Sequence, residues 1–167
     1  MKNLWLLLCL LNSSCGYYHY SNSIGPACFP GDALVATTQG PKRIAELKAN
    51  DEVVSFDFGN ETFTIAKIES LEIKQASYLL ELIFESGTVL LVTADHPLLK
   101  IDSGVKAYQR ADTLEPGHRL VAYNDQLVAE DETISEVNRI EWSQPVYNLK
   151  VRRYENFVVH GIVAYGY

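Results

Sequence analysis

The segment at positions 43–47 reads Arg-Ile-Ala-Glu-Leu, and 67 positions later the segment at 110–114 reads Arg-Ala-Asp-Thr-Leu. The same shift, with no gap, superimposes further pairs along both halves of the chain: Val53 on Leu120, Val54 on Val121, Glu69 on Glu136, Ile73 on Ile140, Leu82 on Leu149, Phe84 on Val151 and Val92 on Val159. A register kept over most of both halves indicates an internal duplication. The sequence therefore predicts two copies of one structural unit.

Short apolar runs recur in both copies, and many are rich in the β-branched and aromatic residues that are typical of strands. They lie at 33–36, 52–56, 63–65, 78–84, 89–92, 119–122, 146–151 and 157–159. Turn pairs such as Ser86-Gly87 and Pro116-Gly117 separate them. Helix signals amount to about one turn each, at 44–47 and 110–114. We expect an all-β, compact, pseudo-twofold fold built from two strand-rich repeats, because neither repeat closes its own sheet edges.

Size and charge limit the classes of partner. The 167 residues, 47% of them hydrophobic and 21% charged, suit one medium globular domain with a real core. The net charge of −7 gives no electrostatic reason to bind nucleic acid or an anionic membrane surface. We expect a monomer that binds no nucleic acid.

The N-terminus differs from the rest of the chain. Lys2 precedes an apolar run at 4–11, and small residues follow it up to Gly16. This pattern predicts a secretory signal peptide at 1–16, since the run is shorter than the ~20 residues that span a bilayer. We therefore expect a secreted or extracellular protein. A lipoprotein anchored to a membrane through Cys15, and a cytosolic protein with a buried first helix, are the alternatives.

The signal-peptide assignment decides which of the three cysteines remain in the mature chain. Cys9 leaves with the signal peptide, and if Cys15 leaves too, Cys28 is the only thiol of the mature chain. A lone cysteine in a secreted protein is either reactive or paired with another chain. If Cys15 stays, a Cys15–Cys28 disulfide is the alternative, and it would block the thiol.

Four blocks of sequence carry the candidate chemistry. They are Cys-Phe-Pro-Gly-Asp-Ala at 28–33 with Gly-Pro-Lys-Arg-Ile-Ala-Glu-Leu at 40–47, Val-Thr-Ala-Asp-His-Pro-Leu at 92–98, Val-Tyr-Asn-Leu-Lys-Val at 146–151, and Asn-Phe-Val-Val-His-Gly-Ile-Val at 156–163. In this order and spacing they resemble the hedgehog/intein (Hint) family. The resemblance implies a Hint autoprocessing domain at 28–167, closest in chemistry to the hedgehog type, preceded by a short linker or released peptide at 17–27.

The resemblance also implies roles for single residues. A thiol attacks as the thiolate, and the nearest target of Cys28 is the carbonyl of Ala27, which an N–S acyl shift converts into a thioester. His96 would supply the proton that the leaving amide nitrogen needs, because its reference pKa of ~6.5 is close to neutrality. Thr93 would hydrogen-bond the scissile amide, and Asp95 and His160 are supporting candidates.

Departures from the family pattern limit the reaction. Inteins end in His-Asn followed by a second nucleophile, whereas Tyr165, Gly166 and Tyr167 occupy those places here. Without a carboxamide that can cyclise, we expect no protein splicing. Sterol transfer, as in hedgehog proteins, uses an additional region, so we expect water or a small thiol rather than a sterol to resolve the thioester. Glu69 and Glu72 are candidates for the acceptor side.

Two functional hypotheses follow. The first is a cis-acting cysteine autoprocessing domain, a self-cleaving enzyme of single turnover whose substrate is its own N-terminal segment. The second is a catalytically degenerate, secreted Hint-fold binding or structural module, in which Cys28 is inert or disulfide-bonded. The joint presence of Cys28, Thr93 and His96 favours the first. The histidines lack metal-ligand spacing, so we expect no metal and no cofactor.

Overall fold

A computed structural model describes residues 27–124 and 128–167. The signal peptide predicted at 1–16, with Cys9 and Cys15, lies outside the described residues, as does the linker predicted at 17–27 except for Ala27. Within the described part of the chain, no helix is long and apolar enough to cross a membrane.

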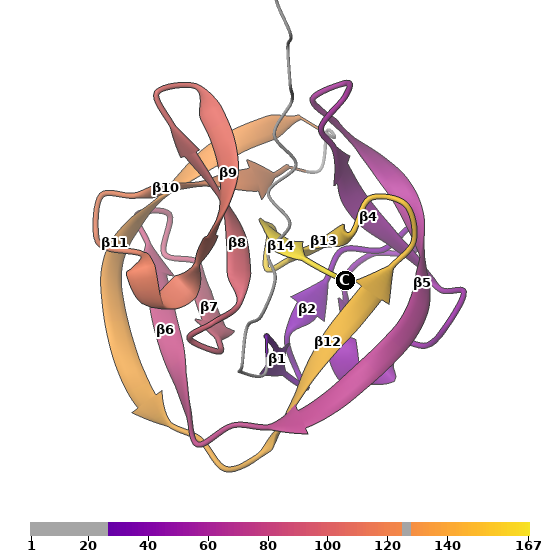
Figure 1. Cartoon of the computed structure of the whole chain (residues 1–167), viewed down its shortest axis with the longest axis horizontal. Coiled ribbons are helices and arrows are strands. Elements are labelled where there is room, and N and C mark those ends of the chain that lie inside the picture. Colours follow the sequence, from indigo (N-terminus) through magenta and orange to yellow (C-terminus); the bar gives the residue numbers. More distant parts are fainter. Residues whose placement is uncertain (1–26, 125–127) are drawn as a thin grey trace, which may run out of the picture.

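The regular secondary structure of the described chain is almost entirely β-strand, which confirms the all-β prediction (Figure 1). The strands are β1 (Phe29–Pro30), β2 (Leu34–Val35), β3 (Lys42–Arg43), β4 (Glu52–Asp57), β5 (Thr62–Gln75), β6 (Tyr78–Phe84), β7 (Val89–Val92), β8 (Pro97–Asp102), β9 (Val105–Arg110), β10 (Arg119–Tyr123), β11 (Ala129–Glu141), β12 (Pro145–Val151), β13 (Asn156–Val159) and β14 (Ile162–Tyr165). Two single 3₁₀ turns, η1 (Ile44–Glu46) and η2 (Ala111–Thr113), occupy the places where one-turn helices were predicted.

The internal duplication is visible in where the strands begin. Strands β4, β5, β6 and β7 begin at Glu52, Thr62, Tyr78 and Val89. Strands β10, β11, β12 and β13 begin 67 residues later in each case, at Arg119, Ala129, Pro145 and Asn156. The two 3₁₀ turns keep the same spacing. The repeat predicted from the sequence is therefore a repeat of structure.

The two halves complete each other's sheets. Each half forms a hairpin, β4–β5 in the first and β10–β11 in the second. Each long strand then pairs with a strand of the other half, β5 with β12 and β11 with β6, in antiparallel register. In Figure 1, β5 and β11 curve around opposite sides of the molecule, with β1, β2, β8, β13 and β14 between them. This reciprocal pairing gives the pseudo-twofold arrangement.

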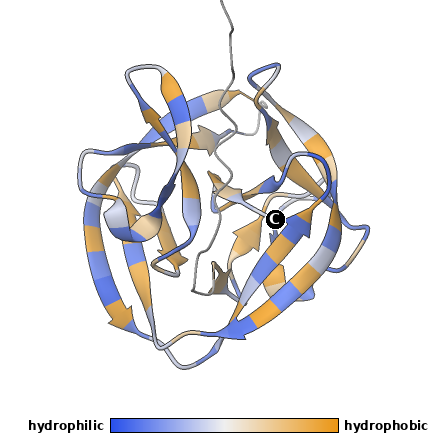
Figure 2. Ribbon diagram, viewed as in Figure 1, coloured by the Kyte–Doolittle hydropathy of each residue, from blue (hydrophilic) through white to orange (hydrophobic). Residues whose placement is uncertain are grey.

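The long strands alternate polar and apolar residues, so that one face packs inward and the other faces solvent (Figure 2). Strands β13 and β1 are instead fully buried in the centre. There the rings of Phe29 and Phe157 meet edge to face with their centroids 5.8 Å apart. The core thus holds the short strand β1, and with it the residue just before that strand, in a fixed place.

A buried asparagine joins the two halves where no strand ladder does. The side-chain oxygen of Asn156 accepts a hydrogen bond from the Phe56 amide at 2.6 Å. Its side-chain nitrogen donates to the carbonyls of Phe56 and Tyr154 at 3.0 and 2.8 Å. The two bonds to Phe56 are buried, where a backbone group without a partner is costly. Asn156 therefore fixes β13 against β4.

Candidate active site

Cys28 lies at the entry to β1, where the chain passes into the centre of the fold. Strand β1 pairs with β12, Phe29 opposite Tyr147 and Pro30 opposite Val146. The Cys28 side chain has 0% exposure and packs beside Leu79 and Val146. It is a free thiol in the structure. Ala27 is buried as well, so the whole Ala27–Cys28 peptide is enclosed.

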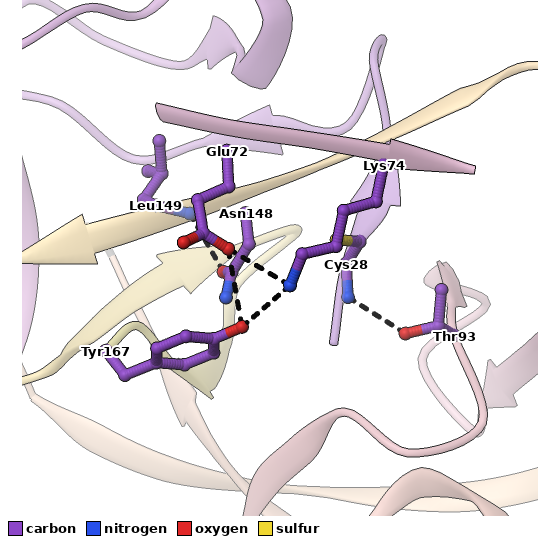
Figure 3. A network of polar contacts seen from close by, with 7 residues as sticks. All are labelled: Cys28, Glu72, Lys74, Thr93, Asn148, Leu149 and Tyr167. Atoms are coloured by element: carbon purple, nitrogen blue, oxygen red, sulfur yellow. Dashed lines mark hydrogen bonds and ion pairs between the residues drawn. The ribbon is translucent and has the colours of Figure 1, made fainter. Parts of the chain in front are cut away.

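Thr93, in the turn after β7, holds that peptide in place. Its hydroxyl oxygen accepts a hydrogen bond from the Cys28 amide N–H at 2.8 Å (Figure 3). Its own amide N–H donates to the Cys28 carbonyl at 3.0 Å. The first of these bonds is made by the nitrogen of the Ala27–Cys28 peptide, the atom for which the resemblance predicts a contact with Thr93.

His96 lies in the same turn and is completely buried. Its amide N–H donates to the Thr93 carbonyl at 3.1 Å, and its ring packs on Phe29 with centroids 4.3 Å apart. Neither ring nitrogen makes a hydrogen bond of ordinary geometry with the described residues. The backbones of Ala27 and Tyr165 nonetheless lie close enough to favour the protonated ring. A backbone carbonyl oxygen can accept a proton from imidazolium, which is how these two backbones favour the charged ring.

Burial outweighs these carbonyls and lowers the pKa of His96 to about 3. The imidazole is therefore neutral at pH 7. The reference value near 6.5, from which a proton donor was expected, does not hold here because the ring is cut off from water. A neutral imidazole can still take up a proton from one group and pass it to another.

Burial also raises the pKa of the Cys28 thiol to about 12. The positive charge of Lys74 acts in the opposite direction, and the negative charges of Glu72 and Asp95 raise the pKa further. The resting site thus pairs a protonated thiol with a neutral imidazole. Attack on a carbonyl requires that the thiol lose its proton as it reacts.

The two predicted supporting residues lie in different surroundings. Asp95 is buried next to His96 in the chain, and its Oδ2 atom has no hydrogen-bond partner among the described residues. His160 lies in the turn between β13 and β14. Its Nε2 accepts from the Leu34 amide at 3.2 Å, and its own amide donates to the Leu34 carbonyl at 2.8 Å. The contacts of His160 are thus with β2.

A polar cluster beside Cys28 was not predicted as a unit. Lys74 Nζ lies 3.1 Å from Glu72 Oε2 and 2.9 Å from the Tyr167 hydroxyl oxygen (Figure 3). Asn148, opposite Glu72 in the β12–β5 pair, is buried, and its side-chain nitrogen lacks a partner among the described residues. Of these residues, only Glu72 had been predicted from the sequence to lie near the acceptor side of the site. Strand register assembles the cluster, and no spacing along the chain indicates it.

Gly166 occupies a place that admits no side chain. A Cβ atom there would lie 2.7 Å from Phe157 Cδ1 and 2.8 Å from the Leu149 carbonyl oxygen. Both backbone groups of Gly166 are hydrogen-bonded. Its amide N–H donates to the Glu155 carbonyl at 2.8 Å, and its carbonyl accepts from the Val151 amide at 3.0 Å. An asparagine at this position would require the backbone to move.

No group of three or more histidine, cysteine or acidic residues is arranged to hold a metal ion within residues 27–124 and 128–167.

We expect the free energy of unfolding to fall as the pH drops from about 6.5 toward 3. The unfolded chain protonates this imidazole near its reference value, whereas folding lowers the pKa of His96 to about 3. The loss approaches about 1.4 kcal/mol for each pH unit. Urea unfolding of the wild type and of His96→Gln at pH 7, 6 and 5 measures this loss. The free energy of unfolding should depend less steeply on pH in the variant.

Burial also lowers the pKa of His160, so His160→Gln serves to subtract its share of the pH dependence. Equal slopes for wild type and His96→Gln would contradict the assignment of a buried, neutral imidazole.

Two curated proteins resemble parts of the sequence. The DNA topoisomerase 1 of Pyrococcus furiosus is 36% identical over 98 residues, which are 58% of this chain and 9% of that protein. Warthog protein 1 of Caenorhabditis elegans is 32% identical over 90 residues, 53% of this chain and 18% of that protein. The chain thus matches only a small part of either relative. No family model matches it.

Solved structures match nearly the whole described chain. The PabCDC21-1 intein superimposes with a TM-score of 0.78 at 20% identity, covering 86% of this chain and all of that one. A DnaB intein from Synechocystis gives 0.76 at 19% identity, covering 85% and 99%. A bacterial intein-like domain from Clostridium thermocellum gives 0.75 at 20% identity, covering 85% and 100%.

Proposed function

We propose that this chain, which has the Hint fold of inteins, is a cis-acting cysteine autoprocessing domain that cleaves its own Ala27–Cys28 bond. The observation that carries the proposal is the enclosed Ala27–Cys28 peptide. Thr93 binds its nitrogen at 2.8 Å, His96 lies against the backbone of Ala27, and the thiol belongs to the next side chain. Nucleophile, scissile bond and proton carrier are thus in one dry site.

The first step is an N–S acyl shift. The Cys28 sulfur forms a bond to the Ala27 carbonyl carbon while the bond from that carbon to the Cys28 nitrogen breaks. The thiol proton passes to the imidazole of His96 and from there to the departing nitrogen, which becomes a free amine. No external reactant is consumed, and the product is a thioester between Ala27 and Cys28.

Proximity supplies much of the acceleration, since well-oriented intramolecular attack reaches effective molarities of ~10⁵–10⁸ M. The hydrogen bond from the Cys28 amide to Thr93 fixes the orientation of the peptide that must break. Complete burial of His96 keeps the imidazole neutral, and because burial also lowers its pKa, the thiol proton passes to the ring only as the sulfur attacks.

The second step is resolution of the thioester by water or a small thiol, which releases the N-terminal segment. Gly166, at the place where inteins carry the asparagine that cyclises, has no carboxamide, and the space around it admits no side chain. This supports cleavage of the hedgehog type rather than splicing. The proposal includes a secreted, monomeric protein whose substrate is its own N-terminal segment.

The alternative is a degenerate Hint module with an inert thiol. The burial that raises the pKa of Cys28 to about 12 is the observation in its favour, because a buried protonated thiol is a poor nucleophile. The two functions differ in whether the Ala27–Cys28 bond ever opens.

The deciding experiment fuses a folded reporter upstream of residues 17–167 and follows cleavage with and without dithiothreitol. We expect thiol-stimulated release of a reporter fragment that ends at Ala27 and carries dithiothreitol as a thioester adduct, which mass spectrometry identifies. An intact fusion under all conditions, with the domain folded by circular dichroism, would refute autoprocessing and leave the inert module.

A further inference from the structure

Lys74 reaches the active site from a strand that does not contact β1. Strand β12 lies between β5 and β1, and its residue Val146 pairs with Lys74 on one side and with Pro30 on the other. Figure 3 shows the Lys74 side chain near Cys28, with its Nζ directed at Glu72 and Tyr167. The three-strand register thus brings Lys74 close enough for its charge to act on Cys28.

The charge of Lys74 acts on both reacting groups. It lowers the pKa of the Cys28 thiol, second in effect only to burial, and it also lowers the pKa of His96. The other charges that act on Cys28, those of Glu72 and Asp95, work in the opposite direction. Among the described residues, Lys74 is thus the cation whose field favours a thiolate beside a neutral imidazole.

Two partners hold the ammonium group in place. Glu72 Oε2 lies 3.1 Å from Lys74 Nζ, and the Tyr167 hydroxyl oxygen lies 2.9 Å away, with the ammonium 5.6 Å from the centre of the tyrosine ring. The Tyr167 hydroxyl in turn donates to Glu72 at 3.4 Å. Although burial opposes it, these contacts raise the pKa of Lys74, which keeps the ammonium charged.

We infer that Lys74 is the residue that stabilises the negative charge of the reacting Cys28 sulfur, and that Glu72 and Tyr167 position it for this task. The inference deepens the proposed autoprocessing and rests on it. Negative charge forms first on the sulfur and then on the former carbonyl oxygen of Ala27. A cation held in place beforehand stabilises such charge without having to reorganise during the reaction.

The side chain of Lys74 is 35% exposed, so solvent weakens its field. We therefore expect an effect of about tenfold, the equivalent of one unit in the thiol pKa. Because Cys28 is fully buried, iodoacetamide reaches it only when the site opens, and below the thiol pKa the alkylation rate depends on that opening and on the thiolate fraction. Comparing Lys74→Met with Lys74→Arg and Lys150→Met, at equal stability in urea, isolates the charge effect independently of cleavage.

The test uses the full chain carrying Cys9→Ser and Cys15→Ser, which leaves Cys28 as the single thiol. Alkylation of Cys28 and thiol-induced cleavage are both measured between pH 7 and 9 by mass spectrometry. Lys74→Met should slow both by about tenfold at each pH, and Lys74→Arg, which keeps the charge, should restore both to within about threefold of the parent.

Lys150→Met is the matched control. Lys150 lies on β12, and its Nζ is 3.0 Å from Glu69 Oε1 across the same strand pair, so the variant also removes one cation and one ion pair. Its charge is not among those that act on Cys28 or His96. We expect Lys150→Met to leave both rates unchanged.

Tyr167→Phe tests the positioning, because it removes the hydroxyl that holds the Lys74 ammonium and changes no charge near Cys28. Alkylation should slow in Tyr167→Phe, by less than in Lys74→Met. Unchanged alkylation in Lys74→Met, or an equal loss in Lys150→Met, would overturn the inference. If no variant cleaves while alkylation follows the expected order, autoprocessing has failed and the charge effect of Lys74 on the thiol stands.

Discussion

Replacement of Cys28 by alanine is expected to abolish release of an upstream reporter, with and without dithiothreitol. The thiol forms the only covalent link in the proposed first step, so no other described group substitutes for it in the resting geometry. The measurement is the amount of fragment ending at Ala27 after overnight incubation, compared with the wild-type fusion. Because the nucleophile is gone, we expect no detectable fragment on a gel or by mass spectrometry, which corresponds to a loss of roughly 10³-fold or more.

Cys28→Ser is the companion variant, because it keeps a nucleophilic atom at the same place with a far weaker tendency to lose its proton. We expect slow cleavage or none. We also expect no iodoacetamide adduct at position 28, because serine has no thiol. Both variants should unfold at close to the wild-type temperature, since Cys28 packs as a small apolar side chain. Wild-type rates of release from Cys28→Ala would refute the thioester mechanism.

His96→Gln is expected to slow cleavage by about 10²–10⁴-fold, the usual contribution of a positioned proton carrier. Glutamine fills much of the space beside Phe29 but cannot relay a proton between the thiol and the leaving nitrogen. Single-turnover rates of reporter release at pH 7 and 8 measure the effect. Cys28 alkylation, which needs no proton transfer to the amide, should change much less than cleavage.

His118→Gln provides the matched control for His96. His118 lies in the turn before β10, and its Nδ1 accepts a hydrogen bond from the Glu115 amide at 3.1 Å. We expect this variant to cleave at the wild-type rate. A His96→Gln rate within a few-fold of the wild type would show that the proton moves by another route.

Much of the fold could be predicted because the duplication repeats the strand-forming segments at a constant spacing. The predicted runs at 78–84 and 89–92 coincide with β6 and β7. Strand β11, by contrast, was not predicted as an apolar run, because only Ile134 of its residues is fully buried and the remainder is largely polar. Its strand character comes from pairing with β6 and β10, which the local sequence does not record.

The candidate site also has a part that the sequence predicts and a part that it does not. Cys28, Thr93 and His96 come together because two sequence blocks carry them in short, ordered segments, and these blocks could be identified. Lys74 and Tyr167 were missed because their proximity to Cys28 depends on the register of β5 with β12. The protonation state of His96 was also beyond sequence reasoning, since an isolated His-Pro pair gives no sign that the ring is wholly buried.

The reciprocal pairing of the two halves has a consequence for when the chain can react during its synthesis. Cys28 leaves the ribosome early, but the enclosure of its peptide requires Thr93 and His96, then β12, and finally the backbone of Tyr165. Domains emerge N-terminus first and fold as units. Until residue 165 has been translated and packed, the Ala27–Cys28 bond is an ordinary exposed peptide. Under the proposed reaction, a chain in which residue 165 has not yet packed keeps its N-terminal segment, and release reports that this domain has folded.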